Sequence, residues 1–227
     1  MNPALQKQSA PTTRRLTVGL TTGRVAVIHP MILRSPLRHS SALALAGGLA
    51  LGCQSTPRSN LRGFEVTRLD GARIRLLPEA STRAWVFVFL SVDCPIANRC
   101  LPELNALART SPPHGIRFIF VYPNADELPA AIRQHQEEFG VVGEVYRDPH
   151  HDLARQLDAS VTPEVILLEV DGSPIYRGRV NDQYLTLGRG RPEPTQHDLA
   201  DAIQQFRAGH PSVGVVHPAV GCTFRTR

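Results

Sequence analysis

Two long apolar runs, the first of them followed by a helical pattern, limit the possible folds of this chain most. The runs are WVFVFL at residues 85–90 and IRFIFVY at residues 116–122. Such β-prone runs are typical of strands that are buried on both faces of a sheet. After the first run, apolar residues recur at the spacing of one helix face: Ala97, Cys100, Leu101, Leu104, Leu107 and Ala108. We therefore predict an α/β domain built on a central sheet.

Turn and capping residues predict the elements on either side of these strands. FEVTRL and ARIRLL flank Asp70-Gly71, which predicts an N-terminal β-hairpin. Asn124 and Glu127 have the spacing of a capping box, so we expect a helix from Asn124 to Gly140.

The second half of the chain adds shorter elements. EVYRD is expected to form a strand, and Asp148-Pro149 is expected to open a brief helix. TPEVILLEV and PIYRGRV predict two strands joined through Asp171-Gly172, and the last helix is expected to start at Thr195. Parallel strands that alternate with helices and end in an antiparallel hairpin predict a mixed sheet with helices on both faces.

The basic charge of the chain is concentrated near its start. The formal net charge is +5, yet residues 1–53 hold six basic residues and no acidic residue. The remainder is therefore close to neutral, and the excess of positive charge belongs to the leader. This distribution argues against a nucleic-acid-binding surface on the body of the protein.

Residues 31–53 have the pattern of a secretory signal. Two arginines precede ALALAGGLALG, a stretch shorter than the roughly 20 residues that span a bilayer. The stretch ends in ALGC, which resembles a lipobox, a motif whose cysteine is lipidated and becomes the first residue of the mature protein. That cysteine is Cys53. The usual lipobox places Leu first of the four, so a plain cleaved signal and a short core helix with a buried cysteine both stay open.

The signal reading divides the chain into segments and places the protein in a compartment. A lipid-anchored protein of this kind lies in the periplasm or the cell envelope, where disulfides persist. The expected segments are a non-structural extension or mis-assigned start at 1–30, the signal at 31–53, a polar tether at 54–62, the folded domain at 63–210 and a tail at 211–227.

Cys94 is the strongest candidate for a reactive residue. It lies where the first apolar strand gives way to a helix, and Pro95 suits the first helical position because its φ is fixed and it lacks an N–H. Cys94 is then the N-cap, so its sulfur faces unpaired N–H groups that lower the pKa of a thiol. The neighbouring Asp93 acts in the opposite direction.

Cys100 is too far along the helix to form a disulfide with Cys94. Residues six apart in a helix have Cα atoms about 10 Å apart, whereas a disulfide requires less than about 7 Å. Cys100 also falls on the apolar face of the predicted helix, which favours a core thiol. A resolving or metal-binding role for Cys100 stays open.

Several separated motifs resemble those of a known superfamily. They are DCPIANRC at 93–100, Thr162-Pro163 before a strand, YRGRVND at 176–182 and Gly221-Cys222. The chain resembles the thioredoxin-like redoxins, which include the alkyl hydroperoxide reductase and thiol-specific antioxidant proteins and the TlpA-like oxidoreductases. Within them it is similar to a secreted bacterial branch.

The resemblance implies a thioredoxin-like fold and a set of site residues. In such a fold a cis-proline loop, here Thr162 and Pro163, faces the reactive Cys94 and shapes the substrate groove together with Pro95. Cys222 lies in a tail that could fold back and supply the resolving thiol, as C-terminal cysteines do in some peroxiredoxins. A free or intermolecular thiol at Cys222 stays open.

Two departures from the family patterns bear on the activity. The chain has no CxxC motif, so dithiol exchange within one motif is in doubt. The peroxiredoxin pattern has Thr or Ser three residues before its cysteine, where Ser91 fits, and Pro four residues earlier, where Phe87 does not. Thiol oxidoreductase is therefore the leading hypothesis and thiol peroxidase the second. A copper-handling module resembling the Sco proteins and a redox-inactive binding module remain.

Other polar clusters are weaker candidates. Arg177, Arg179 and Asp182 are expected to form ion pairs that support the hairpin, and a site role stays open. His150-His151 could suggest a metal, but solvated polar residues are expected at a helix start. We expect no cofactor and no metal. The expected partners are a thiol or disulfide protein, or a peroxide, and the membrane through a lipid anchor.

Overall fold

A computed structural model describes residues 63–211 and 213–225. The signal, the tether and lipidation at Cys53 lie outside the described residues. The helices are α1 (Pro95–Thr110), the 3₁₀ helix η1 (Pro112–His114), α2 (Pro129–Phe139), α3 (Asp152–Gln156) and α4 (Asp198–Arg207). The strands are β1 (Phe64–Thr67), β2 (Arg73–Leu76), β3 (Ala84–Phe89), β4 (Ile116–Tyr122), β5 (Glu144–Arg147), β6 (Val161–Thr162), β7 (Glu164–Glu169), β8 (Pro174–Gly178), β9 (Tyr184–Thr186), β10 (Arg189–Gly190), β11 (Val215–His217) and β12 (Cys222–Thr223).

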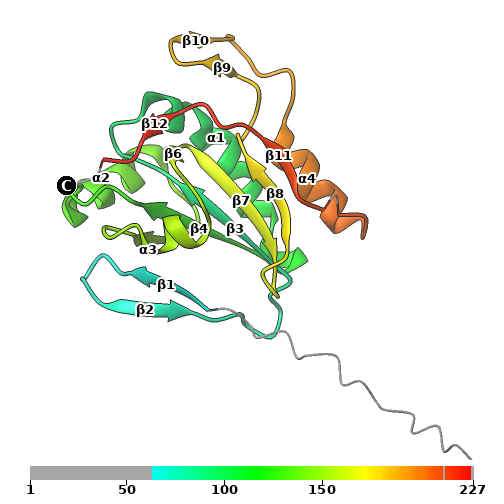
Figure 1. Cartoon of the computed structure of the whole chain (residues 1–227), viewed down its shortest axis with the longest axis horizontal. Helices are drawn as coiled ribbons and strands as arrows, with labels where there is room; N and C mark the ends of the chain where they lie inside the picture. Colours follow the sequence, from blue (N-terminus) through cyan, green and yellow to red (C-terminus); the bar gives the residue numbers. More distant parts are fainter. Residues whose placement is uncertain (1–62, 212, 226–227) are drawn as a thin grey trace, which may run out of the picture. The chain divides into compact units, whose positions relative to one another are not determined.

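A mixed sheet forms the centre of the domain, as the sequence predicts (Figure 1). Its strand order is β11-β8-β7-β3-β4-β5-β1-β2. The central strand β3 pairs in parallel with β4 and antiparallel with β7, and β8 and β7 form the predicted antiparallel hairpin. The predicted N-terminal hairpin is also confirmed, because β1 and β2 pair antiparallel and extend the sheet beyond β5.

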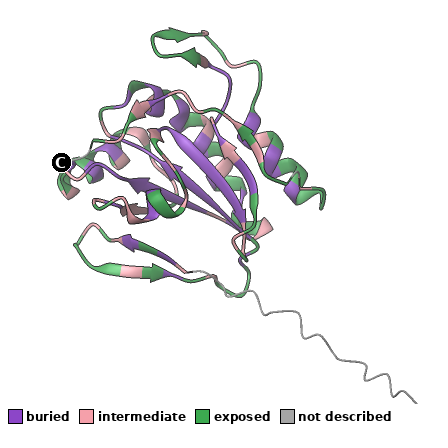
Figure 2. Cartoon of the chain, viewed as in Figure 1, coloured by how far each residue is buried: buried purple, intermediate pink, exposed green. Residues whose placement is uncertain are grey.

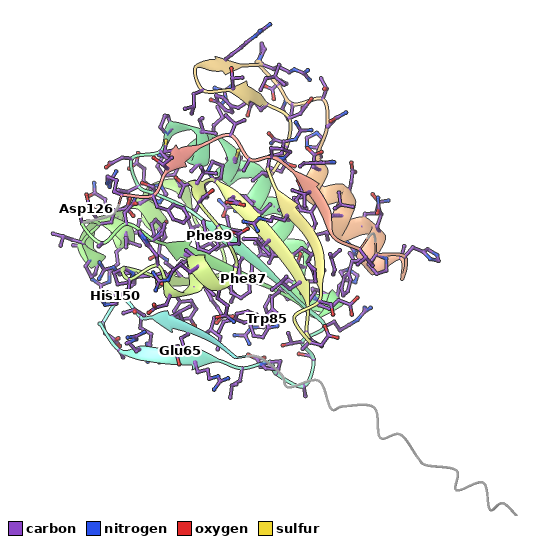
Figure 3. All side chains as sticks on the ribbon, in the orientation of Figure 1. Glu65, Trp85, Phe87, Phe89, Asp126 and His150 are labelled. Carbon is purple, nitrogen blue, oxygen red and sulfur yellow. The ribbon has the colours of Figure 1, made fainter. Side chains whose placement is uncertain are left out.

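Strand β3 is buried on both faces because different elements cover each of them (Figure 2). Val86 and Val88 point into a core that includes residues of α1, α2 and α4. Trp85, Phe87 and Phe89 alternate with them and point into a second core with β1 and α3, as Figure 3 shows for the three aromatic rings. This double burial explains why the run has no polar alternation.

The helix expected from Asn124 begins later, at Pro129. The expected capping box does not cap the helix, because its two side chains serve another purpose. Asn124 Nδ2 donates to Glu127 Oε1 at 2.8 Å and to Ser91 Oγ at 3.0 Å, so both residues bind the loop before α1. The predicted helix end is confirmed: Gly140 is the C-cap in the left-handed region at φ 58°.

The last helix begins at Asp198, three residues after the expected start. The backbone N–H groups of Thr195 and Gln196 donate to Asp182 Oδ1 at 2.6 and 2.9 Å, which holds this stretch outside the helix. The predicted buried face, Leu199, Ala202, Ile203 and Phe206, is confirmed. In the described part of the chain, no helix is long and apolar enough to cross a membrane.

Five short strands were not expected from the sequence, and two of them direct the end of the chain. β11 pairs in parallel with β8 at the sheet edge, and β12 then pairs antiparallel with β6. β9 and β10 form a separate exposed hairpin (Figure 2). The path through β11 and β12 carries the C-terminal segment across the end of the sheet to the loop before α1.

Gly178 allows β11 to pair with β8, and we expect Gly178→Ala to be strongly destabilising. Gly178 has φ 131°, and an added Cβ would lie 1.6 Å from the His217 carbonyl oxygen. We expect a loss of about 3 kcal/mol in the free energy of unfolding, measured in urea. Gly172→Ala is the matched control, because that glycine also has positive φ but open space around it. An equal loss in both variants would contradict this account.

Candidate functional site

The loop between β3 and α1 places Cys94 at the start of the helix. Pro95 is the first residue of α1, and Cys94 is the N-cap with an extended backbone, φ −85° and ψ 107°, as predicted. The Cys94 carbonyl accepts the Asn98 N–H at 3.0 Å, the first bond of the helix. The Cys94 side chain is only 1% exposed, so its sulfur is covered by the rest of the fold.

The Thr162-Pro163 loop lies against the Cys94 sulfur. The peptide bond between these two residues is cis. Cys94 Sγ is 2.9 Å from the Thr162 carbonyl oxygen, which accepts a hydrogen bond from the thiol. The cysteine that follows the central strand β3 therefore lies against a cis-proline loop from a later part of the chain, just before β7.

The C-terminal segment brings Cys222 to the same place. Strand β12 pairs with β6 so that Cys222 is opposite Thr162 in the register. The Cys222 side chain lies close enough to Cys94 for each thiol to shift the pKa of the other, and all three described cysteines are free thiols. From the sequence, a C-terminal tail that brings Cys222 back to Cys94 was one of several possibilities. In the structure the two thiols lie beside each other.

This arrangement decides the fold. A central strand between one parallel and one antiparallel neighbour, a cysteine at the N-cap of the following helix and a cis-proline facing it are the features that the resemblance implied. The chain has the thioredoxin-like fold. The fold expectation from the sequence is thereby confirmed.

Solved structures are similar to this chain. An uncharacterised conserved protein of Geobacillus kaustophilus is 25% identical with a TM-score of 0.63, and the match covers 74% of this chain and 90% of that one. A hypothetical protein of Sinorhizobium meliloti is 19% identical with a TM-score of 0.63, over 74% and 92% of the two chains. A secreted disulfide oxidoreductase of Mycobacterium tuberculosis is 18% identical with a TM-score of 0.44, over 64% and 95%.

Comparisons at the level of sequence give no further assignment. No family model matches the chain, and no curated protein matches it.

The surroundings of Cys94 favour its thiolate. Burial raises the pKa of the thiol, but hydrogen bonding from the Cys222 thiol, from the Ala97 backbone N–H and from Thr162 lowers it, and the net result is a pKa below the ordinary value. The interaction with the Cys222 side chain is the largest of the effects that lower the pKa of Cys94.

The other two thiols have raised pKa values. Burial, the hydrogen bond to Cys94 and the charge of Cys94 raise the pKa of Cys222 to about 11. Burial raises the pKa of Cys100 to about 12, and its side chain packs in the core with 3% exposure. The three cysteines thus divide into one thiolate former, one hydrogen-bond donor beside it and one core thiol.

A buried carboxylate supports the loop that carries Cys94, and sequence reasoning missed this role. Glu127 Oε1 accepts hydrogen bonds from the Ser91 hydroxyl at 2.5 Å and the Val92 N–H at 3.2 Å. Glu127 is 3% exposed, and its Oε2 has no partner among the described residues. Burial raises the pKa of Glu127 in spite of these bonds. The spacing of Asn124 and Glu127 was a signal, but it was assigned to a helix cap.

We expect Glu127→Gln to change how stability depends on pH. Because the folded state raises the pKa of Glu127, its favourable contribution is present below the unfolded pKa and is lost as pH rises through the folded pKa. The variant cannot ionise, so its free energy of unfolding should improve relative to the unsubstituted protein between about pH 4 and pH 7. Urea unfolding at both pH values measures this, with exposed Glu137→Gln as the control. A pH-independent difference would contradict the expectation.

Arg225 offsets the acidic residues beside the site. Its guanidinium lies 3.6 Å from Asp93, 3.0 Å from Asp126 and 3.4 Å from Glu127. Asp93 had been expected to oppose ionisation of Cys94, and the nearby guanidinium counters that charge. The C-terminal segment therefore supplies a cation as well as a thiol.

The weaker candidates for site residues, the arginines of YRGRVND and the histidine pair, make contacts that support the fold. Arg177 pairs with Glu164 at 2.9 Å, and Arg179 pairs with Asp198 at 2.8 Å, which joins β8 to β7 and to α4. His151 Nε2 contacts the Pro123 carbonyl at 3.0 Å. Within residues 63–211 and 213–225, no group of three or more His, Cys, Asp or Glu side chains is placed to hold a metal ion.

Proposed function

We propose that the protein is a thiol-disulfide oxidoreductase in which Cys94 is the attacking thiol and Cys222 the resolving thiol. One observation carries this proposal: strand β12 places Cys222 opposite Thr162, whose carbonyl oxygen is 2.9 Å from Cys94 Sγ, so the two cysteines lie beside each other. A thiolate beside a protonated thiol is the reduced form of a dithiol centre. Thr162 and Pro163 would line the substrate groove beside Pro95.

The exchange proceeds in two steps. The Cys94 thiolate attacks one sulfur of a substrate disulfide, forms a mixed disulfide and releases the other substrate sulfur as a thiolate. Cys222 then loses its proton and attacks the Cys94 sulfur, which forms the Cys94–Cys222 disulfide and releases the second substrate thiol. The substrate is reduced by two electrons, and the protein dithiol is oxidised by two. The reverse sequence oxidises a substrate dithiol.

The electrostatics of the pair favour the second step once the first is complete. The pKa of Cys222 is raised first by burial and then by its bond to Cys94 and the charge of Cys94. In the mixed disulfide the Cys94 sulfur carries no charge, so these last two contributions vanish. The pKa of Cys222 then falls, and Arg225 favours its thiolate.

Disulfide exchange is favoured over peroxide reduction by the contacts of Ser91. Ser91 was the local support for the peroxidase hypothesis, yet its hydroxyl donates to Glu127 Oε1 at 2.5 Å. Phe87, at the other position of that pattern, is buried in the core. Of the two residues that would mark a peroxidase site, the proline is absent and Ser91 is engaged with Glu127.

Parallel assays test the proposed function. The reduced protein is mixed with a disulfide-bonded peptide in one assay and with hydrogen peroxide in the other, and released thiols or peroxide loss is followed. We expect Cys94-dependent peptide reduction. Peroxide consumption without peptide reduction would favour the peroxidase, and tight Cu(I) binding lost with Cys94 would favour a copper module. Absence of all three would indicate a redox-inactive binding module.

We also propose that the protein works outside the cytoplasm, anchored through a lipid on Cys53. The support is the signal pattern at 31–53, together with a dithiol centre that suits an oxidising compartment. Membrane fractionation of cells that express the full chain or its Cys53→Ser variant measures this. We expect the anchored protein in the membrane fraction and the variant outside it, and an identical distribution would contradict the proposal.

A further inference from the structure

The C-terminal segment fills a strand edge beside the reactive sulfur. β12 pairs with β6 in a two-stranded sheet, with Cys222 opposite Thr162 and Thr223 opposite Val161 (Figure 1). The edge of a strand presents N–H and C=O groups that can pair with any extended chain. Here the edge next to Cys94 is occupied by the protein itself. We call residues 221–225 the latch segment.

Close packing seats the latch segment on the cis-proline loop. An added Cβ on Gly221 would lie 2.2 Å from the Thr162 carbonyl oxygen, so a glycine is required for this approach. The ring centroid of Phe224 lies 5.6 Å from those of Phe89 and His151. These contacts fix the latch segment at both of its ends.

Arg225 ties the latch segment to the loop after β4. Its backbone N–H donates to Asn124 Oδ1 at 2.8 Å, and its guanidinium pairs with Asp126 at 3.0 Å. The Arg225 and Asp126 side chains are 44% and 57% exposed, so this pair contributes little stability and can open without unfolding the core.

The latch segment covers the Cys94 thiol, which is the reacting group. Cys94 is 1% exposed, although thiol exchange requires a substrate sulfur to reach it along the S–S axis. A cysteine within a polypeptide also brings its own backbone, which needs the space now held by residues 221–223. The closed arrangement therefore blocks a protein substrate more strongly than a small one.

We infer that the latch segment is an intramolecular competitor for the β6 edge, and that it must release before an extended, cysteine-bearing segment of a partner protein can reach Cys94. This inference rests on the proposed function, because it describes access to the same thiol. Release also frees Cys222, and the latch segment then displaces the partner's backbone from the β6 edge as Cys222 returns and resolves the mixed disulfide.

The test compares a small and a large probe with the same reacting group on the full, reduced chain. N-Ethylmaleimide and a maleimide coupled to polyethylene glycol react with the same thiolate, so the ratio of their rates cancels any change in the pKa of Cys94. Peptide mass spectrometry follows the modification of Cys94 itself. The ratio reports how far the site must open for a bulky partner.

Arg225→Ala and Gly221→Val release the latch segment in two independent ways. We expect Arg225→Ala to raise the large-to-small rate ratio at Cys94 by about threefold, because exposed ion pairs contribute little. We expect Gly221→Val to raise the ratio further, because its Cβ would lie 2.2 Å from the Thr162 carbonyl oxygen. Arg68→Ala, which removes the exposed pair with Asp70, and Gly214→Ala, at a glycine with open space, are the matched controls. A ratio that stays unchanged in both release variants while the fold persists would overturn the inference.

The outcomes separate this inference from the proposed function. Maleimide labelling requires no redox turnover, so an increased ratio supports the latch even if Cys94 exchanges no disulfide. If exchange depends on Cys94 but the ratio is unchanged in both release variants, the latch inference fails and the proposed function stands.

Discussion

Cys94→Ser is expected to abolish disulfide exchange, with the rate falling by about 10³-fold or more toward the background. Serine has nearly the shape of cysteine, but its hydroxyl does not form a nucleophilic anion at neutral pH. The Cys222 thiol no longer faces the charge of Cys94 in this variant, but burial, the largest cause, still raises its pKa, so it replaces Cys94 poorly as the attacking group. The measurement is the rate of reduction of a disulfide-bonded peptide by the reduced protein.

Cys100→Ala is the matched control for this prediction. Cys100 lies on the same helix and is buried in the core, where the pKa of its thiol is about 12. We expect its removal to cost about 1 kcal/mol of stability through the lost packing, with exchange retained. Activity that survives Cys94→Ser, or that is lost equally in Cys100→Ala, would contradict the assignment of the attacking thiol.

Cys222→Ser is expected to stop the reaction at the mixed disulfide between Cys94 and the substrate. Cys94 can still attack the substrate, but the mixed disulfide then has no internal thiol to resolve it. We expect turnover to fall by about 100-fold, because an adjacent thiol acts at a far higher effective concentration than one in solution. Intact-protein mass spectrometry should show an adduct with the mass of the peptide, absent from the unsubstituted protein.

The adduct distinguishes resolution from simple activation of Cys94. Cys222 also lowers the pKa of Cys94, so its loss slows the first step to some degree. A slower first step alone gives less adduct, whereas a missing resolving thiol gives more. A variant that turns over slowly without any adduct would contradict the resolving role.

The core of this fold could be predicted from the sequence because buried elements have recognisable local patterns of apolar residues. β3 and β4 are apolar runs, and the stripe of α1 repeats at helical spacing, so both could be read before the structure was known. The N-cap position of Cys94 followed from Pro95 alone. Each of these features is encoded within a few residues.

The contacts that complete the site depend on residues distant in the chain, which no local pattern contains. Cys222 and Thr162 are separated by 60 residues, yet they pair in β12 and β6. Asn124 and Glu127 have the spacing of a helix cap but bind the loop at Ser91, because tertiary hydrogen bonds outweigh the local preference. The late start of α4 has the same origin in Asp182.

Disulfide mapping of the oxidised full chain tests the central claim most directly. The protein is treated with a disulfide-bonded peptide, remaining thiols are blocked, and the cross-linked peptides are identified by mass spectrometry. We expect a Cys94–Cys222 disulfide, with Cys100 still a free thiol. A Cys94–Cys100 disulfide, or a Cys94 that never pairs with Cys222, would contradict it.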